Sequence, residues 1–231
     1  MALEIRLPKI KFCGLTRAID VSAAVELGAD AIGLNFYQPS PRYVSPEAAR
    51  GLCQISSGKV LRVGVFVNAS PAEVDGVLSI CPLDCVQLHG DETPEWMNEA
   101  MRFARFESVV FIKAVAWQGH DDDDKVVSKW TTSCHPRLLG LLVDAFDPIQ
   151  RGGTGKTARW DLLFPRPTAF RELPFLLAGG LTVENISTAI EIARPDGVDL
   201  ASGIESAPGI KDHWKMRTIV EVAEKLLDNP S

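Results

Sequence analysis

The sequence lacks the features that direct a chain into a membrane, onto nucleic acid or through a secretory route. No apolar run approaches the ~18 residues that a membrane helix requires. Residues 1–12 alternate charged and apolar side chains, unlike the unbroken apolar core of a signal peptide. Acids outnumber lysine and arginine, so the formal net charge is -6 and the pI is near 5.3. We therefore expect a cytoplasmic protein with no membrane and no nucleic-acid partner, although a small anionic substrate remains compatible with this charge.

Disulfide and metal-ligand patterns are also missing. The five cysteines are an odd number with no Cys-x-x-Cys pair, which predicts free thiols, most of them small buried side chains. The four histidines are scattered, and the adjacent Cys134 and His135 would point in different directions, so no metal site is predicted. No Ser/Gly/Pro-rich linker or low-complexity tract interrupts the chain, and residues 1–231 are expected to form a single domain.

What the sequence does have is a rhythm of eight short apolar runs, each followed by a loop and a helix-like stretch. Continuous rather than alternating hydrophobicity is typical of strands buried on both faces of a parallel sheet. The rhythm predicts an α/β fold of the (β/α)8 TIM-barrel type, and the alternative is a doubly wound open sheet, which usually has fewer strands. The runs are Ile10–Cys13, Ala31–Phe36, Val60–Val67, Cys85–Leu88, Val109–Val115, Leu138–Val143, Phe175–Ala178 and Gly197–Leu200.

Helix starts recur between the runs. Ser45-Pro46-Glu47 and Ser70-Pro71-Ala72-Glu73 combine a capping serine with a first-turn proline and an acid. Further starts are expected at Thr93 and Thr182, with amphipathic helices over residues 16–27 and 211–227. The four acids of Asp121–Lys125 predict a solvated face or a helix start, within a peripheral loop over residues 117–136.

Two groups at strand ends are candidates for acid–base chemistry. Cys13 ends the first run and Asp144 follows the sixth, so both would face the mouth of a barrel. A pair of this kind suits a reaction that removes one proton and adds another, provided that a positive group lowers the thiol pKa. The alternatives are a packed core thiol for Cys13 and a helix cap or ion pair for Asp144.

Other strand-end residues suit a phosphorylated ligand that carries a carboxylate. Glycine-rich loops follow the last two runs, where barrels often bind phosphate, although such glycines also make simple tight turns. Arg42 follows a rigid Pro-Ser-Pro loop and offers a planar fork for a carboxylate, unless it is a surface arginine. His89 either hydrogen-bonds substrate or caps a loop. The predicted phosphate-binding residues are Gly179, Gly180, Ser202 and Gly203.

A nucleotide-binding interpretation fails on spacing. Gly155-Lys156-Thr157 ends like a Walker loop, but Gln150 stands where that loop needs its first glycine, and no strand leads directly into it. We interpret Arg151–Thr157 instead as a mobile loop that closes over the site.

Taken together, these segments resemble the phosphoribosylanthranilate isomerase family of tryptophan biosynthesis. They follow the family's order and span nearly the whole chain, with small departures at Phe12, Ala201 and Ala158-Arg159-Trp160. The matching segments are Lys11–Thr16, Ser40-Pro41-Arg42, Val63–Asn68, Val86–Gly90, Leu142-Val143-Asp144, Gly152–Thr157, Leu177–Leu181 and Val198–Glu205.

The resemblance implies an Amadori rearrangement of N-(5-phosphoribosyl)anthranilate to an open-chain 1-deoxyribulose phosphate. It implies Asp144 as the general acid, Cys13 as the general base, and Arg42 as the group that holds the anthranilate carboxylate. It also implies that the glycine loops hold phosphate. An iminium intermediate acidifies the neighbouring carbon, so no metal, nicotinamide or flavin cofactor is expected.

Two other functions remain open on the residues alone. One is a related sugar-phosphate aldose–ketose isomerase, a chemistry usually run by two aspartates rather than a cysteine and an aspartate. The other is a non-catalytic barrel that binds a phosphorylated ligand, which would have no need of Cys13 near Asp144. Besides the small-molecule substrate, other tryptophan-pathway enzymes are possible partners.

Overall fold

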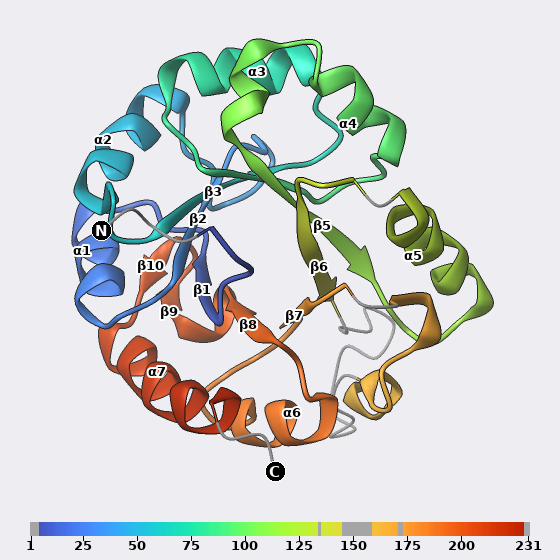
Figure 1. Ribbon diagram of the computed structural model, residues 1–231. Coiled ribbons are helices and arrows are strands. Elements are labelled where there is room, and N and C mark those ends of the chain that lie inside the picture. Colours follow the sequence, from blue (N-terminus) through green and yellow to red (C-terminus); the bar gives the residue numbers. More distant parts are fainter. Residues whose placement is uncertain (1–4, 134, 145–158, 171–172, 229–231) are drawn as a thin grey trace.

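Eight parallel strands close into a barrel in the computed structural model, which describes residues 5–133, 135–144, 159–170 and 173–228 (Figure 1). The strands are β1 (Ile10–Cys13), β2 (Ala31–Asn35), β3 (Leu61–Phe66), β4 (Cys85–Leu88), β5 (Val110–Ala116), β6 (Leu138–Asp144), β7 (Phe175–Ala178) and β8 (Gly197–Leu200). Each strand pairs with the next, and β8 returns to β1 with Asp199 opposite Lys11. The predicted barrel is confirmed, and the open sheet is wrong.

Helices surround the strands on the outside of the barrel (Figure 1). Within the described ranges the α-helices are α1 (Ala18–Glu26), α2 (Pro46–Ser56), α3 (Pro71–Ile80), α4 (Pro94–Ala100), α5 (Asp121–Ser133), α6 (Ile186–Ala193) and α7 (His213–Leu227). Short 3-10 helices add η1 (Ala104–Ser108), η3 (Trp160–Leu163), η4 (Thr168–Phe170) and η5 (Ser202–Ile204). A small hairpin, β9 (Glu205–Ala207) and β10 (Ile210–Lys211), joins η5 to α7. No described helix has the length and apolar character needed to cross a membrane.

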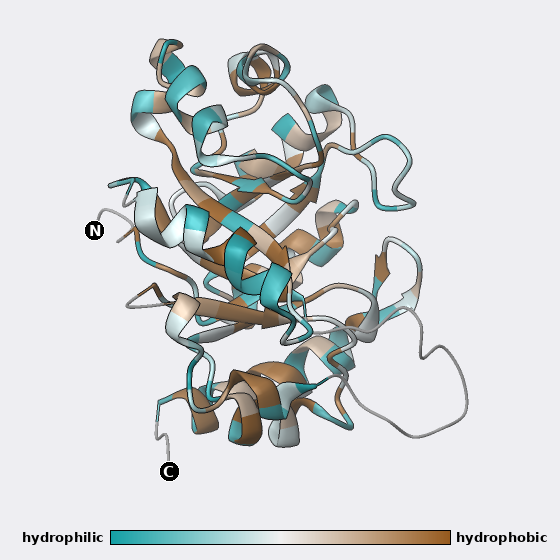
Figure 2. Cartoon of the chain, turned by 90° about the vertical axis from the view of Figure 1, so that its right-hand side faces the viewer, coloured by the Kyte–Doolittle hydropathy of each residue, from teal (hydrophilic) through white to brown (hydrophobic). Residues whose placement is uncertain are grey.

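The chain folds into these elements because its strands bury both faces. Successive side chains of a strand point to opposite sides, so one set fills the barrel and the other meets the helices. Figure 2 shows the strands mainly in the hydrophobic colour and the helices with mixed surfaces. The residues that form the apolar filling of the barrel are Ala31, Leu61, Val63, Cys85, Ile112, Ala114, Leu142, Leu176 and Ala178.

Several predicted helix starts are confirmed, and three helices begin later than predicted. The Ser45 side chain accepts from the Ala48 N–H, and Ser70 forms a full capping box with Glu73. The helix expected at Thr182 begins at Ile186, because the Asn185 side chain first accepts the Thr182 N–H in a turn. The helix expected over residues 16–27 begins at Ala18, and the last helix begins at His213 and not at residue 211.

The segment over residues 117–136 is more structured than predicted. The four acids do begin a helix, α5, where they complement the positive helix end. The same helix buries Trp130 and Val127 against the core, so the expected peripheral loop is wrong. Cys13, Cys53, Cys81 and Cys85 are free and buried, as predicted, and Cys134 lies outside the described residues.

Candidate active site

A cavity of about 530 Å³ lies at the carboxyl end of the strands. It brings together every residue that the sequence singled out for chemistry or binding. Those lining residues are Cys13, Arg42, His89, Asp144, Gly179, Gly180, Ser202 and Gly203. The predicted mobile loop Arg151–Thr157, with its Walker-like Gly155-Lys156-Thr157, lies outside the described residues.

Cys13 ends β1 and reaches the cavity through a crowded site. The N–H groups of Gly14 and Leu15 both donate to the Gly33 carbonyl, at 2.9 and 3.1 Å, which turns the chain away from the barrel after the thiol. A Cβ on Gly33 would stand 2.7 Å from the Cys13 Sγ and 3.2 Å from the Lys11 Nζ. Glycine at this point of β2 therefore leaves the room that the thiol and the ammonium group occupy.

A buried ion pair lies beside the thiol. The Lys11 Nζ donates to Asp199 Oδ1 at 2.6 Å, and both side chains are almost fully enclosed. Burial raises the pKa of Cys13, while the Lys11 ammonium group opposes that rise. Burial alone would lower the pKa of Lys11, but Asp199 and Cys13 raise it, so the lysine stays charged. The resting Cys13 is thus a neutral thiol next to a permanent cation.

Asp144 ends β6 and is partly exposed at the cavity, with β7 and β8 between it and Cys13 along the barrel wall. In the register of the sheet it stands opposite Ala116 on β5 and Ala178 on β7. Neighbouring alanines leave space for a ligand beside the carboxyl group. An ionisable carboxyl group and a thiol thus approach one enclosed volume from separate strands.

His89 follows β4 and is held in a neutral form. Its Nδ1 lies 2.7 Å from the Gln87 amide Nε2, and burial lowers the pKa of the imidazole, which Asp199 partly counteracts. The amide nitrogen can only donate, so Nδ1 accepts and the ring proton resides on Nε2. His89 is therefore a hydrogen-bond donor at the cavity.

Glu92 fixes the loop that carries His89. Its carboxylate accepts from the N–H groups of Gly90 (2.9 Å) and Asn68 (2.8 Å) and from the Lys113 ammonium group (2.9 Å). Lys113 lies on the helix side of β5, under the Trp130 ring, and does not line the cavity. This buried pair supports the loop from outside the barrel.

Arg42 lines the cavity but already has an internal partner. Its Nε and Nη2 groups donate to Glu205 Oε1 and Oε2, at 2.8 and 2.6 Å. The backbone N–H of Arg42 donates to the Ser40 hydroxyl, so the Pro-Ser-Pro loop does hold the arginine in place. The predicted fork is therefore only partly available to a ligand.

The glycine loops after β7 and β8 form one wall of the cavity. Gly179 and Gly180 have φ values of 92° and 66°, a left-handed conformation that favours glycine. Gly203 lies so close to the Leu181 carbonyl that a Cβ would overlap it. The backbones of the two loops can therefore approach each other and a ligand closely, which is what a phosphate site needs.

Sequence reasoning missed four residues of this site: Lys11, Gln87, Asp199 and Glu205. A signal was present for three of them, because a charged or amide side chain inside a fully apolar strand is rarely placed there for packing. Glu205 gave no such signal, since it follows the last strand in an ordinary polar segment.

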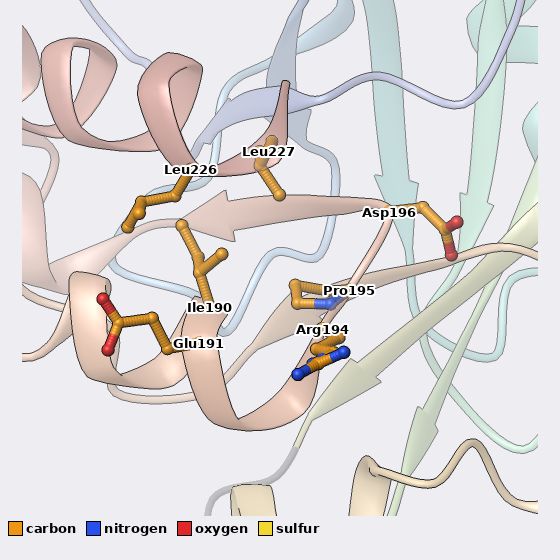
Figure 3. A pocket seen from close by; sticks show the side chains of 7 residues that line it. All are labelled: Ile190, Glu191, Arg194, Pro195, Asp196, Leu226 and Leu227. Atoms are coloured by element: carbon orange, nitrogen blue, oxygen red, sulfur yellow. The ribbon is translucent and has the colours of Figure 1, made fainter. Parts of the chain in front are cut away.

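A second cavity, of about 300 Å³, lies between α6 and α7 near the amino ends of the strands (Figure 3). Ile190 and Leu226 face it, and Arg194 and Asp196 stand at the turn that leads into β8. None of the predicted site residues lines it. The amino end of a barrel serves stability rather than catalysis, so the chemistry belongs to the first cavity.

The fold and the first cavity define a class: a (β/α)8 barrel with a thiol, a carboxyl group and two glycine-rich loops at one mouth, as in enzymes of small phosphorylated metabolites. The chain belongs to the N-(5'-phosphoribosyl)anthranilate isomerase family, whose model matches residues 10–222. The predicted resemblance is confirmed.

Relatives and solved structures of that name agree over nearly the full length. An N-(5'-phosphoribosyl)anthranilate isomerase of Syntrophus aciditrophicus is 43% identical over 94% of this chain and 87% of its own. The enzyme of the same name from Geobacter sulfurreducens is 40% identical, and the match covers 94% of this chain and 98% of that protein. A crystal structure of the Thermotoga maritima enzyme is similar to this chain, with a TM-score of 0.80 and 38% identity. The match covers 94% of this chain and 99% of that one.

Proposed function

We propose that this chain converts N-(5-phosphoribosyl)anthranilate to 1-(2-carboxyphenylamino)-1-deoxyribulose 5-phosphate, with Cys13 and Asp144 as base and acid. The reaction makes the chain an intramolecular oxidoreductase of the aldose–ketose type. One similar structure, with a TM-score of 0.77, 36% identity and coverage of 94% and 99%, is described as a complex with reduced 1-(o-carboxyphenylamino)-1-deoxyribulose 5-phosphate. The single observation that carries the roles is that thiol and carboxyl group share one cavity.

The chemistry needs one proton donated and one removed. Asp144 protonates the furanose ring oxygen, the C1–O bond breaks, and the nitrogen lone pair forms an iminium at C1. Cys13 then removes the proton from C2, and those electrons form an enolamine that tautomerises to the C2 ketone. C1 is reduced and C2 is oxidised within one molecule, so the step balances without an outside redox partner.

The surroundings of Cys13 support its role as a base. A neutral thiol does not abstract a proton, so the reactive form is the thiolate. The Lys11 ammonium group lies beside the sulfur and stabilises that negative charge. Asp199 holds the ammonium group in place from the neighbouring strand, β8. The Lys11 charge thus favours deprotonation of a thiol that burial alone would keep neutral, and the more distant effect of the Asp199 charge opposes it.

The remaining polar groups bind different parts of the substrate. Arg42 binds the anthranilate carboxylate, the Gly179-Gly180 and Ser202-Gly203 loops bind phosphate, and His89 donates a hydrogen bond between them. A volume of about 530 Å³ lies in the range of small-ligand sites. No metal or other cofactor takes part in this scheme.

A coupled fluorescence assay tests the function. Anthranilate and phosphoribosyl pyrophosphate are converted by the preceding transferase, and loss of the product's fluorescence is followed after the protein is added. Wild type is expected to accelerate the loss, and Cys13→Ala and Asp144→Asn are expected to fold normally and abolish it. Near-full activity in either variant overturns that residue's role. Binding of phosphate esters without turnover overturns the enzyme function in favour of a binding barrel.

The setting of the protein completes the proposal. We infer one domain over residues 1–231, located in the cytoplasm, with other tryptophan-pathway enzymes as possible partners beside the phosphorylated substrate. Cell fractionation tests the location, and co-purification from cells tests the partners.

A further inference from the structure

Glu205 is a buried carboxylate that the mechanism above does not use. It begins β9, after the last barrel strand, and its side chain is only 5% exposed. It accepts from Arg42 through both oxygens, from the Lys211 ammonium group at 2.8 Å and from the Gly209 N–H at 3.2 Å. A buried anion with this many donors is committed to one geometry.

The pairing occupies one particular edge of Arg42. A guanidinium group has five N–H donors in a plane. Glu205 takes the side-on edge, formed by Nε and Nη2, and leaves the end-on edge, formed by Nη1 and Nη2. The stem of Arg42 also lies across Gly14, where a Cβ would overlap Arg42 Cδ. Both contacts prevent the guanidinium group from rotating about its long side chain.

A second basic group, Lys211, helps to hold the Glu205 carboxylate. Burial alone would raise the pKa of Glu205, but Arg42 and Lys211 lower it, so the carboxylate stays ionised. Lys211 is itself buried, and donates to the Ala201 carbonyl as well as to Glu205. Burial lowers the pKa of Lys211, and its contact with Glu205 opposes that fall.

We propose that Glu205 is a positioning residue for substrate selection: it holds Arg42 so that the end-on edge meets the carboxylate of the aromatic ring. Arg42 lines the cavity and Glu205 does not, so the guanidinium group stands between its internal partner and the ligand. This inference rests on the proposed function. It adds that recognition of the aromatic acid depends on a carboxylate which never touches the substrate.

The test compares two substrates in wild type and in Glu205→Gln, which keeps the size of the side chain and removes its charge. With N-(5-phosphoribosyl)anthranilate, the variant is expected to raise KM about tenfold and to change kcat less than about twofold. With N-(5-phosphoribosyl)aniline, which lacks the carboxylate, wild type and variant are expected to agree, whether it is used as a substrate or as a competitive inhibitor. An unchanged KM, or the same loss with both compounds, overturns the proposal.

A double variant separates positioning from a general structural role. In an Arg42→Ala background, Glu205→Gln is expected to raise KM no further, because its effect passes through the arginine. Additive losses would show that Glu205 acts elsewhere, and would overturn the proposal. Glu205→Asp keeps the charge, and its KM for the anthranilate substrate is expected to lie between those of wild type and Glu205→Gln. It replaces Glu205→Gln in the comparison if the glutamine variant does not fold. Failure of wild type to turn over the anthranilate substrate would instead refute the proposed function.

Discussion

At the scale of single residues, the candidate site depends on small distances around one sulfur atom. Cys13 has a cation beside it, an aspartate behind that cation and a glycine across from it. Each of these neighbours changes either the pKa of the thiol or its position. Single substitutions can therefore separate electrostatics from sterics.

Removal of the Lys11 charge is expected to shift the pH dependence upward. The ammonium group lowers the pKa of Cys13 against burial, so Lys11→Met raises that pKa. The ascending limb of kcat/KM against pH reports the base of the free enzyme, and is expected to move to higher pH in the variant. A double variant, Lys11→Met with Asp199→Asn, is the control, because it removes the unpaired aspartate charge that would add to the same shift. An unmoved limb in both variants would exclude Lys11 as the stabilising cation.

Extra volume at Gly33 is expected to damage both activity and stability. The Cβ of Gly33→Ala would stand 2.7 Å from the Cys13 Sγ, so thiol or backbone must move. We expect a loss of roughly 1–3 kcal/mol in the free energy of unfolding and a fall in kcat of about 10²-fold, as for a misplaced reacting group. Gly51→Ala is the matched control: its Cβ meets nothing within 4 Å in α2, and helix propensity predicts a gain of about 0.5–1 kcal/mol. Equal kcat values for the two variants would contradict the prediction.

At the scale of elements, strands were predicted better than helix starts. A strand buried on both faces must be apolar along its whole length, so the ends of an apolar run mark the ends of the strand to within a residue or so. Helix starts depend on which of several polar side chains captures an N–H group. Thr182 and Asn185 both have that chemistry, and only the tertiary structure decides in favour of Asn185.

The same contrast explains the site. Cys13, Asp144 and the glycine loops could be predicted because strand ends converge in any parallel barrel. The Arg42–Glu205 pair could not, because its members lie 163 residues apart in the sequence and join two loops. Contacts between loops depend on side-chain conformations that no local pattern encodes.

The capping box of α3 gives a prediction at this scale. Ser70→Ala removes a side chain that accepts the Glu73 N–H, and is expected to cost about 1 kcal/mol in urea unfolding without any change in kcat or KM. Thr93→Ala in α4 is the control, since the Thr93 side chain makes no cap hydrogen bond, and is expected to cost less than half as much. Equal losses would show that the capping bond contributes nothing.

At the scale of the whole molecule, the Lys11–Asp199 pair lies where the sheet closes on itself. β1 and β8 pair in this register, so the ion pair connects the first and last strands of the barrel. Lys11→Met is expected to destabilise the protein by about 3–5 kcal/mol, because it leaves a buried carboxylate unpaired. Adding Asp199→Leu is expected to restore most of that loss. Unfolding of both variants in guanidinium chloride measures the free energy of unfolding. A double variant that is as unstable as the single variant would contradict this prediction.

The position of that pair also means that its two members are synthesised at widely separated times. Lys11 leaves the ribosome 188 residues ahead of the aspartate that neutralises it. At about 5–20 residues per second, β1 waits on the order of ten to forty seconds for its final neighbour. Through that interval the nascent sheet has two open edges, and edge-to-edge association with other nascent chains competes with closure. Slow translation of the last quarter of the message lengthens this exposure, so we expect it to lower the yield of folded protein.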